Sequence, residues 1–129
     1  KKKHLIDPNE LRRIERANKV TAVEYNLLKK IRENLIEEFN HFLRNNFLLM
    51  PTVTIKPPLL EKCKDSKFYD EANLVTLRNT TLANYMNGCS ISIPYFENKK
   101  PIGIMLNAAT NQDDYLLNIS SEIENILHK

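Results

Sequence analysis

The chain has 129 residues, 42% of them hydrophobic, which is the size and apolar content of one ordinary globular domain. Its formal net charge is +3, and the first three lysines account for all of it, so the remaining chain is electrically balanced. Without a basic stripe or a known motif, nucleic-acid binding is not indicated. No apolar run approaches the ~18 residues of a membrane span, and no apolar signal region follows the basic start. We therefore expect a cytoplasmic protein that does not span a membrane.

The first third of the chain carries two helix start signals. Asp7 is a good N-cap, Pro8 suits the first helical position and Glu10 follows at the third, so we predict a helix over residues 8–17. The segment Thr21-Ala22-Val23-Glu24 repeats the capping-box pattern, and apolar residues then recur at spacings of three and four. This pattern predicts a long amphipathic helix over residues 22–44.

A short apolar run and a long connection come next. The run Phe47-Leu48-Leu49-Met50 is too short for a helix and is closed by Pro51, so we predict a strand over residues 47–51 that is buried on both faces. Residues 53–71 contain two adjacent prolines and several charges but no clear period. This segment is predicted to be a loop, and loops of such length in compact domains are usually functional or flexible.

The stretch "LRNTTLANYMNGCSISIP" changes from a helical spacing to a strand-like alternation at Gly88. We predict a helix over residues 74–87, ended by this glycine, and then strands over 89–96 and 102–107 joined as a hairpin by the turn 97–100. Asn111 is placed to cap a last helix over residues 112–128. Helices flanking short apolar strands predict an α/β protein, and the few strands suggest part of a larger domain.

Candidate reactive groups are sparse. Cys63 and Cys89 lie far apart and have no metal-ligand spacing with histidines, and two reduced thiols are favoured over a disulfide. Ser90 and Ser92 share one strand face but lack the glycine-serine context of a nucleophile. Arg78 is different, because an arginine just before a buried strand is suited to holding a carbonyl or a carboxylate. A structural salt bridge or a tie between helix and loop explains the same arginine equally well.

The order of these elements resembles the C-terminal portion of amidase signature enzymes. The segments that carry the resemblance are "IDPNELRRIERANKVTAVEYNLL", "FLLMPT" and "LRNTTLANYMNGCSISIPYFENKKPIGIMLNAATNQDDYLLNISSEIE", which together cover nearly the whole chain. The resemblance implies an α/β fold of a particular kind, the C-terminal part of a mixed-sheet α/β/α sandwich, incomplete in this chain. The residues Asn107-Ala108-Ala109 depart from the glycine that the family commonly has after the second hairpin strand.

The resemblance also implies an activity, which is hydrolysis of a carboxylic amide by a serine, a cis-serine and a lysine. In the family these residues precede the matched region, so no catalytic residue is assigned within the chain, and no metal ligand or cofactor is implied. Arg78, Asn79 and Thr80 resemble residues that shape the substrate region. The implied partners are the N-terminal catalytic part of the same enzyme and a small amide substrate, and a homo-oligomer is left open.

Two further interpretations remain at this point. The first is a glutaminase that resembles an amidotransferase A subunit and releases ammonia for a partner, although "RNTTLANYMNGCSISIP" looks more like the general amidases. The second is a non-catalytic binding or scaffold module that has kept the tail of the fold. The substrate amide and the subfamily do not follow from the sequence.

Overall fold

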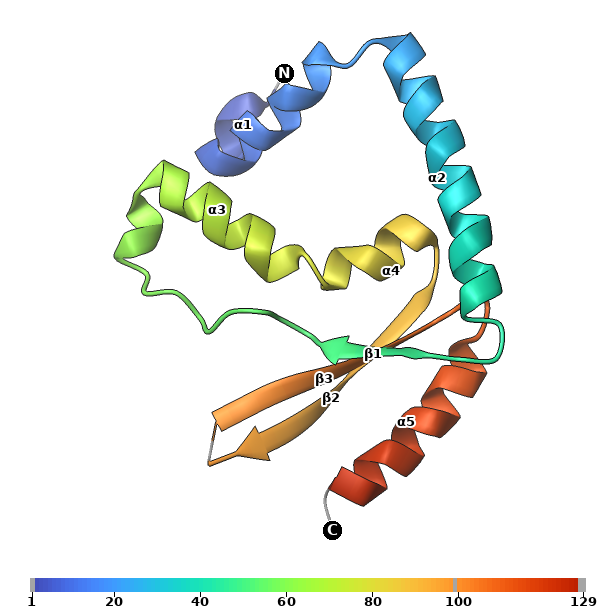
Figure 1. Cartoon of the computed structure of the whole chain (residues 1–129). Coiled ribbons are helices and arrows are strands. Elements are labelled where there is room, and N and C mark those ends of the chain that lie inside the picture. Colours follow the sequence, from blue (N-terminus) through green and yellow to red (C-terminus); the bar gives the residue numbers. More distant parts are fainter. Residues whose placement is uncertain (1, 99, 128–129) are drawn as a thin grey trace. The chain divides into compact units, whose positions relative to one another are not determined.

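The computed structural model describes residues 2–98 and 100–127 of the chain (Figure 1). It is a mixed α/β structure, as predicted, and it divides into two compact units, with the boundary between Glu33 and Asn34 inside a helix. The helices and strands are, in order, α1 Pro8–Arg16, α2 Ala22–Phe42, β1 Leu48–Pro51, α3 Ser66–Leu77, α4 Thr80–Met86, β2 Cys89–Glu97, β3 Lys100–Ala108 and α5 Asp113–Leu127. Three short 3-10 turns lie at Lys3–Leu5, Ala17–Lys19 and Lys62–Lys64.

The first unit is built from the two capped helices that the sequence predicts. The Asp7 side chain accepts a hydrogen bond from the backbone N–H of Asn9 at 2.9 Å, at the start of α1. Thr21 and Glu24 form a reciprocal capping box at the start of α2, with the Thr21 N–H donating to Glu24 Oε2 at 2.8 Å and the Glu24 N–H donating to Thr21 Oγ1 at 3.2 Å. None of residues 2–33 has a buried side chain.

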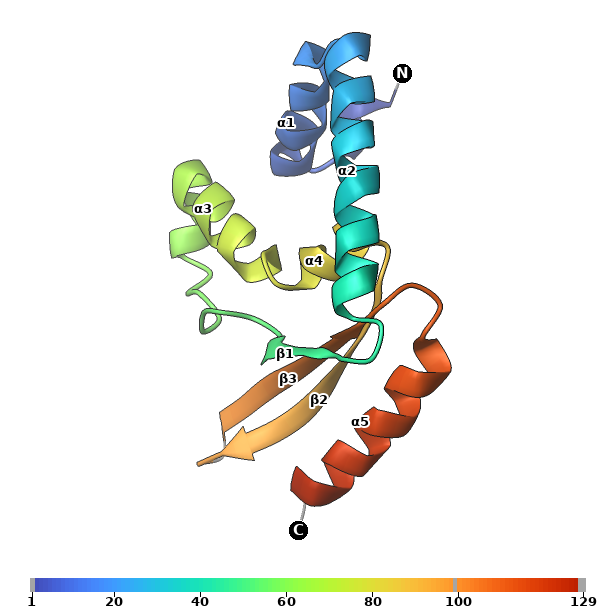
Figure 2. The same ribbon diagram turned by 45° about the vertical axis from the view of Figure 1, so that its right-hand side comes forward.

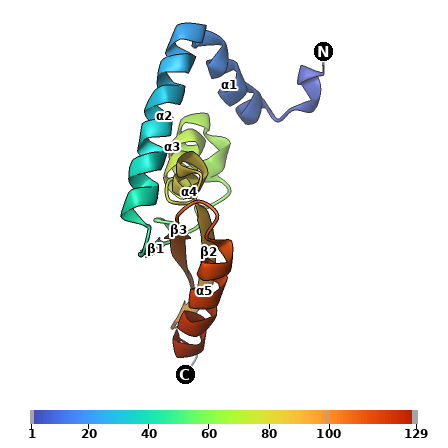
Figure 3. The same ribbon diagram turned by 90° about the vertical axis from the view of Figure 1, so that its right-hand side faces the viewer.

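The second unit contains a three-stranded antiparallel sheet in the order β1-β3-β2. The predicted hairpin is present as β2 and β3, paired without interruption from Cys89 opposite Ala108 to Glu97 opposite Lys100. In the views of Figures 1, 2 and 3 the sheet lies between α5 on one side and α3 with α4 on the other.

The core of this unit lies under the central strand. Residues 105–109 of β3 and the loop after it are all buried, since β3 has a neighbour on each side. Leu116 of α5 packs with Ile93, Leu106 and Ala108 of the sheet, and partly buried residues surround them. The opposite face carries Asn107, which is fully buried and donates from Nδ2 to the Leu48 carbonyl at 3.2 Å.

Four expectations about these elements differ from the structure. The strand β1 is not buried on both faces, because it is an edge strand and Leu49 is 55% exposed. The predicted helix over residues 74–87 is two helices, α3 and α4, with a break at residues 78–79. The long connection is shorter than expected, because α3 begins at Ser66, where the Asp65 side chain caps it by accepting from the Phe68 N–H at 2.7 Å. In addition, the helix predicted to reach residue 44 ends at Phe42.

The end of α4 depends on Asn87 as well as on Gly88. Asn87 adopts the left-handed conformation with φ 53°, and this is the conformation that ends the helix, whereas Gly88 has no positive φ. Gly88 is needed for space, because a Cβ atom there would lie 2.6 Å from the Ala108 carbonyl oxygen and 3.0 Å from the Phe39 ring. Asn111 is likewise left-handed, with φ 60°, and α5 begins two residues later, at Asp113. The expected Asn111 cap is therefore not formed.

Candidate functional site

The break between α3 and α4 places the three predicted site residues together. No proline or glycine interrupts the helix here. The Thr80 and Thr81 hydroxyls instead donate to the Leu77 carbonyl, at 3.1 and 2.6 Å, and compete with the backbone N–H groups that would continue the helix. The chain therefore turns at Arg78 and Asn79, and these residues lie in the corner between the two helices.

Asn79 ties this corner to the end of β1. Its Nδ2 donates to the Pro51 carbonyl at 2.6 Å. In an antiparallel strand, the N–H and C=O of one residue point to the same neighbouring strand, and successive residues alternate. The Gly103 carbonyl accepts from the Thr52 N–H at 2.8 Å, so the backbone groups of Thr52 point towards β3. Pro51 pairs with the next residue of β3, and its carbonyl therefore points away from the sheet. Asn79 thus satisfies a carbonyl that the sheet itself leaves unpaired.

A pair of hydroxyl groups spans the central strand, one on Thr52 directly after β1 and the other on Ser92 of β2. Thr52 Oγ1 and Ser92 Oγ are 2.5 Å apart and form a hydrogen bond across the central strand. Gly103 lies between them, and a Cβ atom there would collide with Thr52 Oγ1 and lie 2.8 Å from Ser92 Oγ. The glycine therefore makes the hydroxyl pair possible. The sequence does not predict this pair. The alternation of β2 shows which face Ser92 occupies, but it does not show that β3 lies between Ser92 and Thr52.

The three predicted site residues differ in what they contact. Asn79 and Thr80 are partly buried, and their side chains are hydrogen-bonded to backbone carbonyls. Arg78 is exposed, and within the described part of the chain its side chain has no hydrogen bond or ion pair. The salt bridge considered for Arg78 is thus not formed with these residues, and its five donors are available to another molecule or another part of the protein.

Residues capable of nucleophilic chemistry are not activated in this arrangement. Among the described residues the hydrogen-bond partner of the Ser92 hydroxyl is the Thr52 hydroxyl, which cannot act as a general base. The Cys89 thiol donates to the Ala109 carbonyl at 3.3 Å, and burial raises its pKa, with a further contribution from the Asp113 carboxylate. Residues 2–98 and 100–127 contain no group of three or more His, Cys, Asp or Glu side chains placed to hold a metal ion. Among the described groups of the corner and the hydroxyl pair, the Arg78 guanidinium keeps donors that no described residue occupies.

The sequence profile of the Amidase family matches residues 2–117. The chain belongs to the Amidase family. A relative of the chain is 2-amino-5-chloromuconic acid deaminase from Comamonas testosteroni, which is 27% identical over 125 residues. The alignment covers 95% of this chain but only 27% of the deaminase, so the chain spans about a quarter of that relative's length. No solved structure matches the chain.

The family assignment confirms the resemblance to amidases at the level of the family. The match includes both capped helices, the sheet and the corner with Arg78, Asn79 and Thr80. Within the described residues, every helix is too short or too polar to span a bilayer.

Proposed function

We propose that this chain is the C-terminal portion of an amidase that hydrolyses the C–N bond of a carboxylic amide. The observation that carries the proposal is the family match over residues 2–117 together with a relative about four times as long. In this proposal the serine, cis-serine and lysine that perform the reaction lie outside these residues. The sheet of the second unit is then one part of a larger mixed-sheet α/β/α sandwich in a cytoplasmic enzyme.

Exposed apolar side chains in the second unit support the proposal that another part of the enzyme covers this surface. α3 and the loop before it carry several large ones, among them Leu59, Leu60 and Leu74, which are 69%, 84% and 67% exposed. Beside them lies a hollow of about 330 Å³ whose lining includes Ile55, Leu59, Phe68 and Val75. Apolar side chains gathered at a hollow, unlike single scattered ones, are typical of an interaction surface. The proposed occupant is the N-terminal catalytic part of the same enzyme.

The open edge of β2 supports the same proposal and limits how the sheet can continue. The backbone carbonyl of Gly103 points towards β1, so the backbone carbonyl of its partner Pro94 points away from β3, towards the free edge of β2. Ser92 and Ser90 lie two and four residues before Pro94 and therefore offer N–H groups at that edge, whereas Pro94 has none. An added strand from the catalytic part would pair along Ser90 and Ser92, and regular pairing would end at Pro94.

The corner residues have a defined role in this proposal. Asn79 and Thr80 hold the turn between α3 and α4, and Arg78, which is exposed there, faces a small amide substrate or a loop of its pocket. An arginine guanidinium suits this role because it donates two parallel hydrogen bonds to a carboxylate or a carbonyl group. The relative is named as a deaminase, and for this protein we likewise propose that the nitrogen is released as ammonia or an amine.

The test is an amide-hydrolysis assay on the complete gene product that contains these residues. Ammonia release from simple aliphatic and aromatic amides is measured, with and without a serine-directed covalent probe, and the labelled residue is found by mass spectrometry. Labelling of a serine outside residues 1–129, with loss of turnover, is expected. Labelling at Ser90 or Ser92 would contradict the proposed location of the nucleophile.

A non-catalytic module is the second candidate, because the described residues provide hydrogen-bonding groups without an activated nucleophile. The two are separated by the gene sequence that precedes residue 1. A lysine followed by a Gly/Ser-rich loop supports the amidase, whereas an unrelated domain or a start codon immediately before residue 1 supports the module. The glutaminase alternative predicts turnover of glutamine in preference to the simple amides.

A further inference from the structure

Arg78 is an isolated positive charge in the second unit. It is the one charged residue between Glu71 and Glu97, and the segments 45–55 and 101–112, which hold β1 and most of β3, contain no charged residue. The Arg78 side chain is exposed, and within the described part of the chain it makes no hydrogen bond or ion pair. A region with charge of one sign attracts ligands of the opposite sign. An anion that pairs with Arg78 therefore comes from outside these segments.

Backbone acceptors around the corner are already in use. Three carbonyls accept hydrogen bonds from side chains: Val75 from Thr54 at 3.1 Å, Pro51 from Asn79 at 2.6 Å, and Leu77 from Thr80 and Thr81 at 3.1 and 2.6 Å. The Arg78 guanidinium has five N–H donors and no acceptor. The other polar side chains of the corner are a neutral amide and neutral hydroxyls, so Arg78 alone gives the corner a preference for charge.

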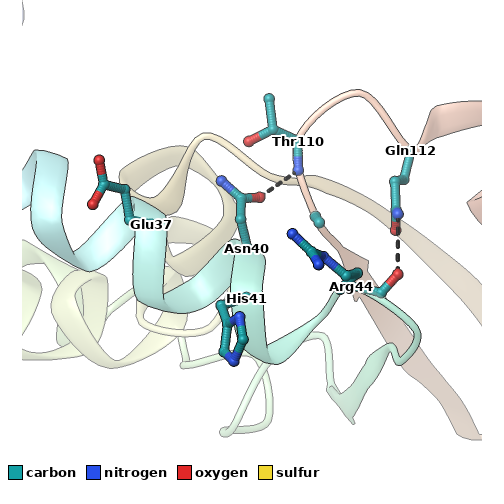
Figure 4. Close-up of a pocket in the computed structure, with 7 residues that line it drawn as sticks. Glu37, Asn40, His41, Arg44, Thr110 and Gln112 are labelled. Carbon is teal, nitrogen blue, oxygen red and sulfur yellow. Dashed lines mark hydrogen bonds between the residues drawn. The ribbon is translucent and has the colours of Figure 1, made fainter.

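A second exposed arginine provides a contrast. Arg44 lines a polar hollow of about 590 Å³ at the end of α2, and the same lining contains Glu37 (Figure 4). The hydrogen bond that ties Arg44 to the loop before α5 uses its backbone carbonyl, which accepts from Gln112 Nε2 at 3.4 Å. With one guanidinium and one carboxylate, this lining has no excess positive charge to select an anion. Within the described residues no carboxylate pairs with Arg78, so the corner does have such an excess.

We infer that the amide substrate carries a carboxylate as a second functional group and that Arg78 binds this carboxylate. The inference rests on the proposed function, in which the corner lies at the substrate, and it adds the chemical class of that substrate. The simplest members of this class are monoamides of dicarboxylic acids. The guanidinium fork matches the two oxygens of a carboxylate, and hydrogen bonds between charged groups are roughly twice as strong as those between neutral groups. A neutral amide would leave the Arg78 charge unpaired.

The experiment measures ammonia release by the complete gene product from succinamate and glutaramate. Each is compared with the neutral amide in which a methyl group replaces the carboxylate, butyramide and valeramide respectively. We expect kcat/KM to be at least tenfold higher for the acid amide in at least one pair. Arg78→Gln should remove this preference by lowering kcat/KM for the acid amide about tenfold, while the value for the neutral amide stays within about twofold. The matched control Arg44→Gln makes the same change at another exposed arginine and should keep the preference.

Turnover without a preference for the acid amide, or a preference that survives in Arg78→Gln, would overturn the inference and leave amide hydrolysis standing. A lower melting temperature of Arg78→Gln with an unchanged preference would do the same and would assign Arg78 to a structural ion pair. If none of the four amides is turned over, the hydrolysis proposal fails, and calorimetry with succinamate and butyramide tests the inference separately. Tighter binding of succinamate that is lost in Arg78→Gln supports it, whereas absent binding or binding unchanged by the variant overturns it.

Discussion

Replacing Gly88 by alanine should destabilise the second unit, although alanine is the better residue in most positions. The added Cβ atom would lie 2.6 Å from the Ala108 carbonyl oxygen and 3.0 Å from the Phe39 ring. The carbonyl belongs to the central strand, opposite Cys89, so it cannot move without separating β2 from β3 at their first pair. Overpacking of this kind costs about 1–3 kcal/mol, whereas the reduced entropy of the unfolded chain returns about 0.4–1 kcal/mol. We expect a net loss of roughly 1–2 kcal/mol.

The measurement is urea unfolding of the complete gene product and of the variant, followed by fluorescence or circular dichroism. The matched control is Asn87→Gly, one residue earlier, where φ is 53°. Glycine adopts this conformation readily, so the control should change the free energy of unfolding by no more than about 0.5 kcal/mol. If Gly88→Ala were as stable as the parent protein, the close approach of the sheet would not be the reason for the glycine. If instead Asn87→Gly alone were strongly destabilising, the account of how α4 ends would be wrong.

The remaining predictions concern the corner and the thiol. Arg78→Lys should lower kcat/KM for amide hydrolysis at least tenfold, because lysine keeps the charge but loses the bidentate geometry of the guanidinium. The melting temperature should stay the same, because the exposed Arg78 side chain supports no described group. A fall in melting temperature with normal kinetics would show a structural role. Asn79→Ala should lower the free energy of unfolding by about 1 kcal/mol through loss of the bond to the Pro51 carbonyl, as measured by urea unfolding, and no change would mean that water replaces the amide fully. Because the pKa of Cys89 is raised, most of its thiol is still protonated at a pH where an ordinary cysteine is half ionised. Alkylation, followed by mass spectrometry, should therefore be slow at that pH and become faster as the pH rises. Asp113→Asn removes one cause of the raised pKa and should make alkylation faster at the same pH, so an unchanged rate would contradict the charge effect.

Features that depend on neighbouring residues in the sequence were predictable. The caps at Asp7 and Thr21 are formed by side chains and N–H groups two or three residues apart, and both are present in the structure. The β2–β3 hairpin also follows from local alternation and a short turn. The start of α3 belongs to the same class, because Asp65 caps it locally, but the charges around it obscured the signal.

Features that depend on strand order were not predictable from one sequence. The run that became β1 is apolar enough for a buried strand, yet its position at the sheet edge leaves Leu49 exposed in this chain. The hydroxyl pair of Thr52 and Ser92 likewise requires that β3 lie between their strands and that Gly103 lie at that register. Similarly, the break before α4 arises from threonine hydroxyls that compete for the Leu77 carbonyl, and hydrophobic periodicity does not report such competition.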